Sequence, residues 1–546
     1  MRFIYKHIYL SIFFLLGCEN DFLSINNPND LSANLFWSSE EDLNLGLVAT
    51  YAALQLDGIL GGTSTIQHPV RSDLGRPNNW NANAIGLNTL TFNENSQIVT
   101  QRWRDSYIGI YRANQVLENI GNVDIDNDLK IKIEAEARFL RAFFYYSLYR
   151  GYNKGSVIIH ASVPEMRNDF YKKPSPAVDV YNLILEDLEF AYQNLPENYV
   201  DSQDKGRATW GAASAMLGKL HINEHNYEIA KKYFKEIIES NIYSLTDNIG
   251  DNFDEENEFN SESIFEVAFS IDAKPGTSYG AKDGPNGSEA TSRARGLATT
   301  EGGGYRTVMP SYYMTMLFRN DIMDENNPKN DTRLGSANYS IRTSVSIAVA
   351  DDDNTTFYQR SSENGGPYNN KEASYLKKFQ NWWLDRENDL SISGINERVI
   401  RLADIMLLYA ECILNTEDDF NQAIELVNSI RRRSGVVPLE LDDYDETSLM
   451  EHIMWTERPL ELMFEGFDIR WEDLIRWGKV KEQYERLSEK TYVISAKVLY
   501  EYNPTIHSAL TPIKEFVEAA NVYSPEVHDY FPIPSAELNS NPDFLD

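Results

Sequence analysis

The chain has 546 residues, of which 42% are hydrophobic and 12% aromatic, so it can form a large core and general disorder is excluded. Its formal net charge of −33 makes nucleic acid and anionic lipid surfaces poor partners. The chain has two cysteines and eight scattered histidines without the spacing of a zinc site, so we expect neither a metal nor a cofactor.

The first 17 residues have the pattern of a lipoprotein signal peptide. Arg2 and Lys6 precede an apolar run of about ten residues, far fewer than the roughly 20 that span a bilayer. Residues 15–18, Leu-Leu-Gly-Cys, resemble a lipobox, which would make Cys18 the acylated first residue of the mature chain. An ordinary signal peptide or a retained membrane anchor is the alternative. Without Arg2 and Lys6 the chain has 48 basic and 83 acidic side chains, a net charge of −35.

Residues 40–54 begin a helix-rich half of the chain. Apolar side chains recur at three- and four-residue steps in residues 107–120, which predicts an amphipathic helix. Residues 130–149 carry the same period and are its expected partner. A further helix is predicted for residues 178–195, and Pro196 ends it.

Two segments have the spacing of tetratricopeptide-like helix pairs. In residues 208–244, Gly218 and Phe234 stand where this repeat brings two antiparallel helices together. Residues 402–433 are a weaker copy, and Cys412 within them is predicted to be a buried thiol. Because such pairs must stack to bury their apolar faces, we expect a mainly α fold on a tetratricopeptide-like helical-pair scaffold.

Residues 247–396 interrupt the helical pattern with a large loop-rich region. We expect a few short strands there, at residues 263–270 and 375–379. Long irregular segments are usually binding loops or disorder, and the aromatic content favours binding loops. The acidic runs at residues 251–258 and 351–353 could hold a structural calcium ion, but they lack EF-hand spacing, so solvated surface is the preferred interpretation.

Seven motifs occur in the same order as in a known family, from residue 36 to residue 534. They are FWSSEEDL (36–43), RAN (112–114), AEARFLRAFFYY (135–146), RLAD (401–404), ERPLELMFEG (457–466), RWEDLIRWG (470–478) and FPIP (531–534). Together they resemble the SusD/RagB outer-membrane lipoproteins of Bacteroidetes. One departure is the insertion of Asp468 and Ile469 before Arg470, where many members pass from glycine to arginine in fewer residues.

The resemblance implies three regions and a role in nutrient capture. The regions are a signal peptide (1–17), an N-terminal helical region (18–246) and a C-terminal region with ligand-binding loops (247–546). It implies a non-enzymatic lipoprotein, anchored in the outer membrane through Cys18 and facing the exterior, that binds an oligosaccharide and acts as the lid of a SusC-like TonB-dependent transporter. A RagB-like peptide-binding protein and a surface glycoside hydrolase are the alternatives.

The charged residues of the two longest C-terminal motifs are expected to pin helices together. Carboxylates and guanidinium groups alternate there with large apolar side chains, a combination suited to charge-assisted pairs inside a scaffold. A catalytic pair cannot be assigned, since the sequence gives no separation between carboxylates. The expected structural residues are Glu457, Arg458, Glu465, Arg470, Asp473, Arg476 and Trp477.

Two loop regions offer the flat rings and planar polar groups that sugars require. The candidate ligand-binding residues in residues 68–81 are Asp73, Arg76, Asn78, Trp80 and Asn81. Those in residues 272–309 are Tyr279, Arg293 and Tyr305. The competing interpretation is that Trp80 packs beneath its own loop and the tyrosines are scattered surface residues. Trp382 and Trp383 are a further candidate pair, but adjacent aromatic residues beside a strand more often cover a core.

Overall fold

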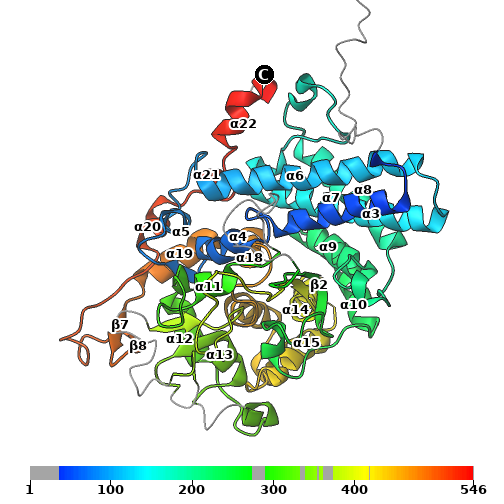
Figure 1. Ribbon diagram of the computed structural model, residues 1–546. Helices are drawn as coiled ribbons and strands as arrows, with labels where there is room; N and C mark the ends of the chain where they lie inside the picture. The colour runs from blue at the N-terminus through cyan, green and yellow to red at the C-terminus, as the bar shows by residue number, and fades with distance from the viewer. Residues whose placement is uncertain are drawn as a thin grey trace, which may run out of the picture.

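The computed structural model describes residues 36–544 except 274–288, 333–337, 353–355, 361–372 and 417. Long helices form one side of the molecule and shorter helices and loops the other, so the expected mainly α fold is confirmed (Figure 1). The long helices are α3 (Glu40–Ala52), α6 (Gln97–Asn119), α7 (Asn127–Gly151), α8 (Ala177–Asn194), α9 (Trp210–Asn223), α10 (Tyr227–Glu239), α14 (Leu402–Asn415) and α15 (Phe420–Arg433).

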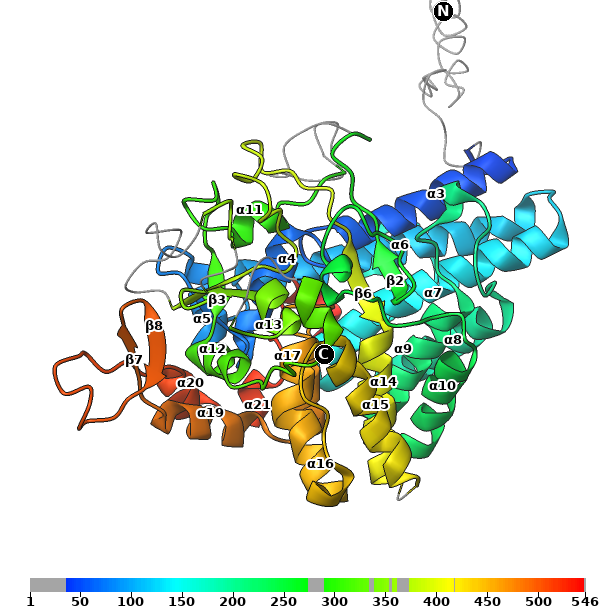
Figure 2. The same ribbon diagram turned by 90° about the horizontal axis from the view of Figure 1, so that it is seen from below.

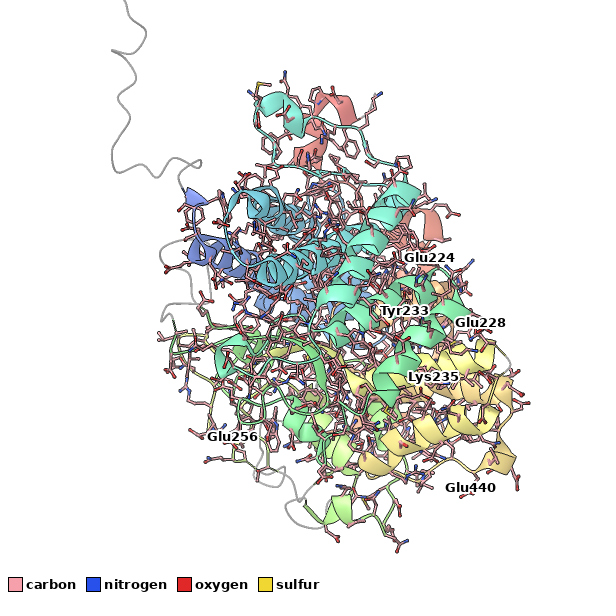
Figure 3. All side chains as sticks on the ribbon, turned by 90° about the vertical axis from the view of Figure 1, so that its right-hand side faces the viewer. Glu224, Glu228, Tyr233, Lys235, Glu256 and Glu440 are labelled. Carbon is pink, nitrogen blue, oxygen red and sulfur yellow. The ribbon has the colours of Figure 1, made fainter. Side chains whose placement is uncertain are left out.

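Consecutive long helices pack against one another, and α14 continues the stack by packing on α10. Figure 3 shows this side of the molecule, with Glu224, Glu228 and Lys235 around Tyr233. The close approach of α9 and α10 depends on Gly218, because a Cβ there would lie 2.3 Å from Cε1 of Phe234. The predicted tetratricopeptide-like pairs at residues 208–244 and 402–433 therefore form one continuous helical stack.

Shorter helices make up much of the rest of the molecule. They are α4 (Gly62–Gln67), α5 (Ala82–Asn88), α11 (Arg293–Leu297), α12 (Tyr312–Arg319), α13 (Ile341–Ser346), α16 (Glu446–His452), α17 (Arg458–Glu461), α18 (Ile469–Arg476), α19 (Val480–Glu489), α20 (Val517–Val522), α21 (Pro525–His528) and α22 (Ser535–Ser540). A π-helical turn, Ile453–Glu457, joins α16 to α17.

The described strands form four antiparallel pairs, of which β1–β3 and β2–β6 join distant parts of the chain. The pairs are β1 (Gly75–Pro77) with β3 (Val308–Pro310), β2 (Ser263–Val267) with β6 (Glu397–Arg401), β4 (Ile347–Val349) with β5 (Ser374–Leu376), and β7 (Tyr492–Ser495) with β8 (Val498–Glu501). Figure 2 shows the β7–β8 hairpin projecting from one side. The strands predicted at residues 263–270 and 375–379 correspond to β2 and β5, which are shorter than expected.

One hydrophobic core runs from Leu43 in α3 to Phe531 near α21. The core includes side chains from the predicted N-terminal region (18–246) and from the predicted C-terminal region (247–546), so these regions do not have separate cores. Cys412 is fully buried, as predicted, and burial raises the pKa of its thiol well above the ordinary value. A buried thiol of this kind is unreactive and fills space in the core.

Buried charged side chains join the C-terminal motifs to β2 and β6. Arg401 is central: its Nη1 lies 2.6 Å from Glu262 Oε1 and 2.8 Å from Glu461 Oε1, and its Nη2 lies 2.9 Å from Glu465 Oε1. Arg433 also pairs with Glu262, at 2.6 Å. These groups satisfy one another where water is excluded, as buried charges require.

A second cluster of buried charges connects α14, α17 and α18. Arg458 lies 2.9 Å from Asp404 and 2.7 Å from Asp473, while Arg476 pairs with Asp473 and Glu411, each at 2.8 Å. Burial alone would raise the pKa of Asp404, but Lys219 and Arg458 lower it to about 2. We call the two clusters the interior ion-pair network. Its members are Lys219, Glu262, Arg401, Asp404, Glu411, Arg433, Arg458, Glu461, Glu465, Asp473 and Arg476.

Asp468, where the sequence departs from the family pattern, connects separate parts of the fold. Asp468 has a φ of +59°, a left-handed conformation that side chains rarely adopt, immediately before α18. Its carboxylate accepts a hydrogen bond of 2.9 Å from His68 Nδ1 and also pairs with Arg102. The turn therefore ties α18 to α6 and to the segment after α4.

None of the described helices is long and apolar enough to cross a lipid bilayer.

Candidate functional site

The pairing of β1 with β3 brings the two predicted binding loops together. Arg76 lies opposite Met309 in this ladder, so the residues after β1 run beside the residues before β3. The amide of Asn78 donates to the Thr307 carbonyl (2.9 Å), and its side-chain Nδ2 donates to the Arg306 carbonyl (3.0 Å). Segments more than 200 residues apart in sequence thus form one surface.

Trp80 and Tyr305 are the exposed rings on this surface. The indole Nε1 of Trp80 donates to the Tyr305 carbonyl (3.1 Å), yet 58% of the Trp80 surface remains exposed. Tyr305 is 38% exposed, with its hydroxyl 3.3 Å from Ser391 Oγ and the Arg295 guanidinium 5.1 Å from its ring centroid. Trp80 does not pack beneath its own loop, because more than half of its surface is exposed while its indole nitrogen is held by the facing loop.

Backbone hydrogen bonds hold the loop before β3. The amide of Gly304 donates to the Thr299 carbonyl (2.7 Å), and the amide of Tyr305 donates to the Arg295 carbonyl (2.9 Å). Gly303 has a φ of +81°, which a side chain would strain. These bonds fix the direction in which Tyr305 leaves the loop.

A third segment, residues 381–391, completes the surface. The amide of Glu387 donates to the Gly302 carbonyl (2.8 Å), and the Glu387 carboxylate accepts from the Tyr358 hydroxyl (2.7 Å) and from the Asn381 amide (2.8 Å). Burial raises the pKa of Glu387 above its ordinary value. We call the surface formed by residues 78–81, 299–307 and 381–391 the aromatic platform.

The two adjacent tryptophans of the third segment have different environments. Trp382 packs on a small cluster that includes Tyr375, with the Lys377 ammonium 3.7 Å from its ring centroid. Burial lowers the pKa of Lys377 to about 7. Trp383 is 37% exposed and stands edge-on to Trp382. Trp382 therefore covers a core, as expected, whereas Trp383, for which a core position was also preferred, adds a partly exposed ring to the platform.

Two exposed carboxylates of the platform, Asp385 and Asp389, each pair with an arginine. Arg386 Nη2 lies 2.5 Å from Asp389 Oδ1, and Arg360 Nη2 lies 3.6 Å from Asp385 Oδ1. Glu387, the buried carboxylate, already accepts the hydrogen bonds described above. This arrangement offers flat rings for stacking and exposed polar groups around them.

The other predicted ligand-binding residues that the structure describes are buried or half-buried. Asp73 is buried in a two-point pair with Arg470 (2.8 and 2.6 Å), and Arg293 is buried against Glu397 and Phe379. Arg76 is half-buried over the Tyr312 ring, and Asn81 caps α5 by accepting from the Ala84 amide. Asp73, Arg76, Asn81 and Arg293 thus position the loops, while Tyr279 and Cys18 lie outside the described residues.

Several carboxylates of the two acidic runs accept hydrogen bonds from neighbouring segments. Glu255 accepts from the Gly394 amide (2.7 Å), and Glu258 accepts from the Asn396 amide (3.1 Å). Asp352 is buried and accepts from Ser344 Oγ (3.0 Å), while Asp353 lies outside the described residues. The interpretation as solvated surface was wrong for Asp352, which is buried, whereas Glu255 is exposed and Glu258 half-buried, and both also accept hydrogen bonds from a neighbouring loop. Among the described residues, no group of three His, Cys, Asp or Glu side chains is placed to hold a metal ion.

Two family profiles match consecutive parts of the chain. The profile of the SusD family matches residues 261–545, and a profile described as starch-binding associating with outer membrane matches residues 21–222. SusD-like protein P25 of Formosa agariphila is 27% identical over 493 residues, which cover 86% of this chain and 88% of that protein.

Solved structures of the same fold span almost the whole chain. A SusD superfamily protein from Bacteroides vulgatus has a TM-score of 0.75 at 23% identity, with 93% of this chain and 98% of that chain covered. Surface glycan-binding protein A from Bacteroides thetaiotaomicron, solved with laminarihexaose, has a TM-score of 0.66 at 20% identity, with coverage of 93% and 98%.

Proposed function

The chain belongs to the SusD family, and from this premise we propose that it binds an oligosaccharide at the cell surface and delivers it to a SusC-like TonB-dependent transporter. The proposed binding surface is the aromatic platform. Surface glycan-binding protein A, which shares the fold, was solved with laminarihexaose, and this supports an oligosaccharide as the ligand class.

The observation that carries the proposal is the pair of exposed rings, Trp80 and Tyr305, fixed by one hydrogen bond between their loops. Sugars have apolar CH faces that stack on such rings, and the rings lose little conformational freedom because their loops are already ordered. A site with few exposed rings and free Asn side chains would favour a peptide. Here Asn78 donates to the facing loop and Asn81 caps α5, so neither side chain is free, which favours a glycan.

We propose that the protein is not an enzyme. A carrier must hold its ligand modestly and release it, whereas catalysis requires tighter binding of a transition state. A glycoside hydrolase needs two carboxyl groups about 5–9.5 Å apart across the scissile bond. Asp385 and Asp389 on the platform pair with arginines, and Glu387 is buried, so these three carboxylates do not support hydrolysis.

A binding screen with glycans and peptides on the purified protein tests the ligand. Trp80→Ala and Tyr305→Ala should each weaken binding of the retained glycan by roughly two- to tenfold, as expected for the loss of one stacking ring. Tyr500→Ala is the matched control, because Tyr500 is 40% exposed on β8, away from the platform. Retention of peptides alone, or hydrolysis of the retained glycan, would reject the proposal.

Cys18 tests the proposed anchoring. Acyl chains contribute about 0.8 kcal/mol per buried methylene, so two or more chains hold a protein stably at a membrane. Cys18→Ala should release the protein from the outer-membrane fraction or prevent its maturation, as measured by fractionation and immunoblotting. A normal amount of the variant on the cell surface would show that lipid on Cys18 is not the anchor.

A further inference from the structure

A groove of about 880 Å³ lies between α6, residues 158–171 and α22. Its walls are fastened to one another: the Trp103 indole on α6 donates to Glu537 on α22 (3.3 Å), and Asn541 Nδ2 donates to the Lys172 carbonyl (3.0 Å). The volume is within the range of sites for small ligands, about 300–1,000 Å³. The groove is therefore an ordered concavity that needs no rearrangement to exist.

The floor of the groove is a row of aromatic rings on one face of α6. Trp103, Tyr107 and Tyr111 recur every four residues, about 6 Å apart along the helix axis. The Trp103 and Tyr107 rings are 5.0 Å apart, and Tyr111 is 39% exposed. Phe170, on the opposite wall, is 50% exposed. A row of rings facing another ring suits a ligand made of successive flat, apolar-faced units.

Polar groups converge on the same rings. His160 lies edge-on to Tyr107 with centroids 5.8 Å apart, and 6.3 Å from the Phe170 ring. Its Nδ1 is buried without a hydrogen-bond partner, although buried polar atoms are nearly always paired. Burial and Lys172 lower the pKa of His160 to about 4, so the ring is neutral at pH 7 and Nδ1 can accept or donate according to its tautomer. Gln115 adds an amide to the lining.

The groove and the aromatic platform are separate surfaces. None of the groove-lining residues belongs to the platform segments. In Figure 1, α22 lies above α6, whereas α11, which leads to Tyr305, lies below it. A ligand bound at one surface would leave the other open.

We propose that the groove between α6 and α22 is a second saccharide-binding site, in which pyranose rings stack on Tyr111 and Phe170 while His160 and Gln115 line the groove beside them. The choice of a saccharide as the ligand rests on the proposed function. The groove, its row of aromatic rings and the unpaired His160 nitrogen are features of the structure that do not depend on that function. Two sites on different faces would let the protein hold two chains, or two parts of one long chain, which raises retention without tighter contacts at either site.

Hydrogen exchange with mass spectrometry on the purified protein tests the two sites separately. The probes are laminarihexaose, maltohexaose, cellohexaose, a galacturonate oligomer and a Pro-rich decapeptide. We expect at least one saccharide to protect residues 100–115 and 158–171. Tyr111→Ala and Phe170→Ala should each weaken this protection by about two- to tenfold in ligand concentration, because each removes one stacking ring. Both side chains are exposed enough for the variants to fold.

Trp80→Ala and Tyr500→Ala are the matched comparisons. Groove protection that survives Trp80→Ala would support an independent site. If the platform is protected but no saccharide protects the groove, the second site is rejected while the proposed function stands. If only the groove is protected, the platform assignment fails and the groove proposal stands. Protection of the groove by the peptide alone, or its loss in Trp80→Ala, would also overturn the second site.

Discussion

The interior ion-pair network and the aromatic platform place their side chains in opposite environments: charged groups lie inside the protein, and apolar rings lie at its surface. In the network, charged groups are taken out of water and paired with opposite charges, and Arg401 alone pairs with Glu262, Glu461 and Glu465. On the platform, apolar rings are left in water, and Trp80 and Tyr305 are held by backbone bonds of their loops.

The difference shows where charge and aromaticity act in this protein. The motifs with the most charged residues lie in the interior, where their ion pairs determine how the helices meet. In this role the geometry of the pairs matters more than their net contribution to stability. The exposed rings contribute little to folding, since their apolar faces remain solvated. We therefore expect substitutions in the network to change stability and substitutions on the platform to change binding.

The largest effect is expected from Arg401→Met. The substitution keeps much of the side-chain volume but leaves three buried carboxylates short of a cation, and breaking buried pairs of this kind typically costs about 3–5 kcal/mol. The measurement is urea or thermal unfolding followed by circular dichroism. Arg432→Met is the matched control, because Arg432 pairs with Glu425 at the surface and such pairs contribute about 0–1 kcal/mol. Equal losses in both variants would contradict the assigned role of the network.

A smaller effect is expected from acid. The pKa of Asp404 is about 2 in the folded protein and 3.8 ordinarily, so its pairing with Lys219 and Arg458 stabilises the fold above pH 4. This contribution, on the order of 2 kcal/mol, is lost as the pH falls from about 4 to 2, when the folded protein takes up the proton. The melting temperature should therefore fall less steeply over this range in Asp404→Asn than in the wild type. Parallel curves would contradict the shifted pKa.

The smallest effect on stability is expected on the platform. Trp80→Ala removes a ring that is 58% exposed, so the free energy of unfolding should change by no more than about 0.5 kcal/mol. The same substitution should lower glycan affinity, as described above. A platform variant that lowers the melting temperature as much as Arg401→Met would show that the rings are part of the scaffold and would remove the contrast between the two regions.

The helical stack could be predicted because its pattern is local. Apolar periodicity located α7, α8 and the two tetratricopeptide-like pairs within a few residues. It missed the start of α6 at Gln97, ten residues before the predicted helix, because Arg102, Asp105 and Ser106 are buried there and interrupt the apolar pattern. Strand β6 was missed for the same reason, since charged residues make up most of this fully buried strand.

The candidate site was only partly predictable. Composition identified Trp80 and Tyr305 as rings in loops, but their contact joins positions 225 residues apart and depends on the β1–β3 ladder. Asp73 looked equally available in sequence, and only its distant partner Arg470 explains its burial. The groove had a local signal, the four-residue spacing of Trp103, Tyr107 and Tyr111, but that spacing alone is also typical of a core-facing helix.

The late-synthesised residues 531–541 close the face of the earliest long helices. The amide of Phe531 donates to the Gly151 carbonyl (2.7 Å), the amide of Ser535 donates to the Glu94 carbonyl (3.1 Å), and Glu537 reaches Trp103. A nascent chain therefore carries an uncovered aromatic row for more than 400 residues of synthesis, and loops of this length close slowly. Until that closure, the row is a surface that chaperones can bind and at which unfinished chains can aggregate.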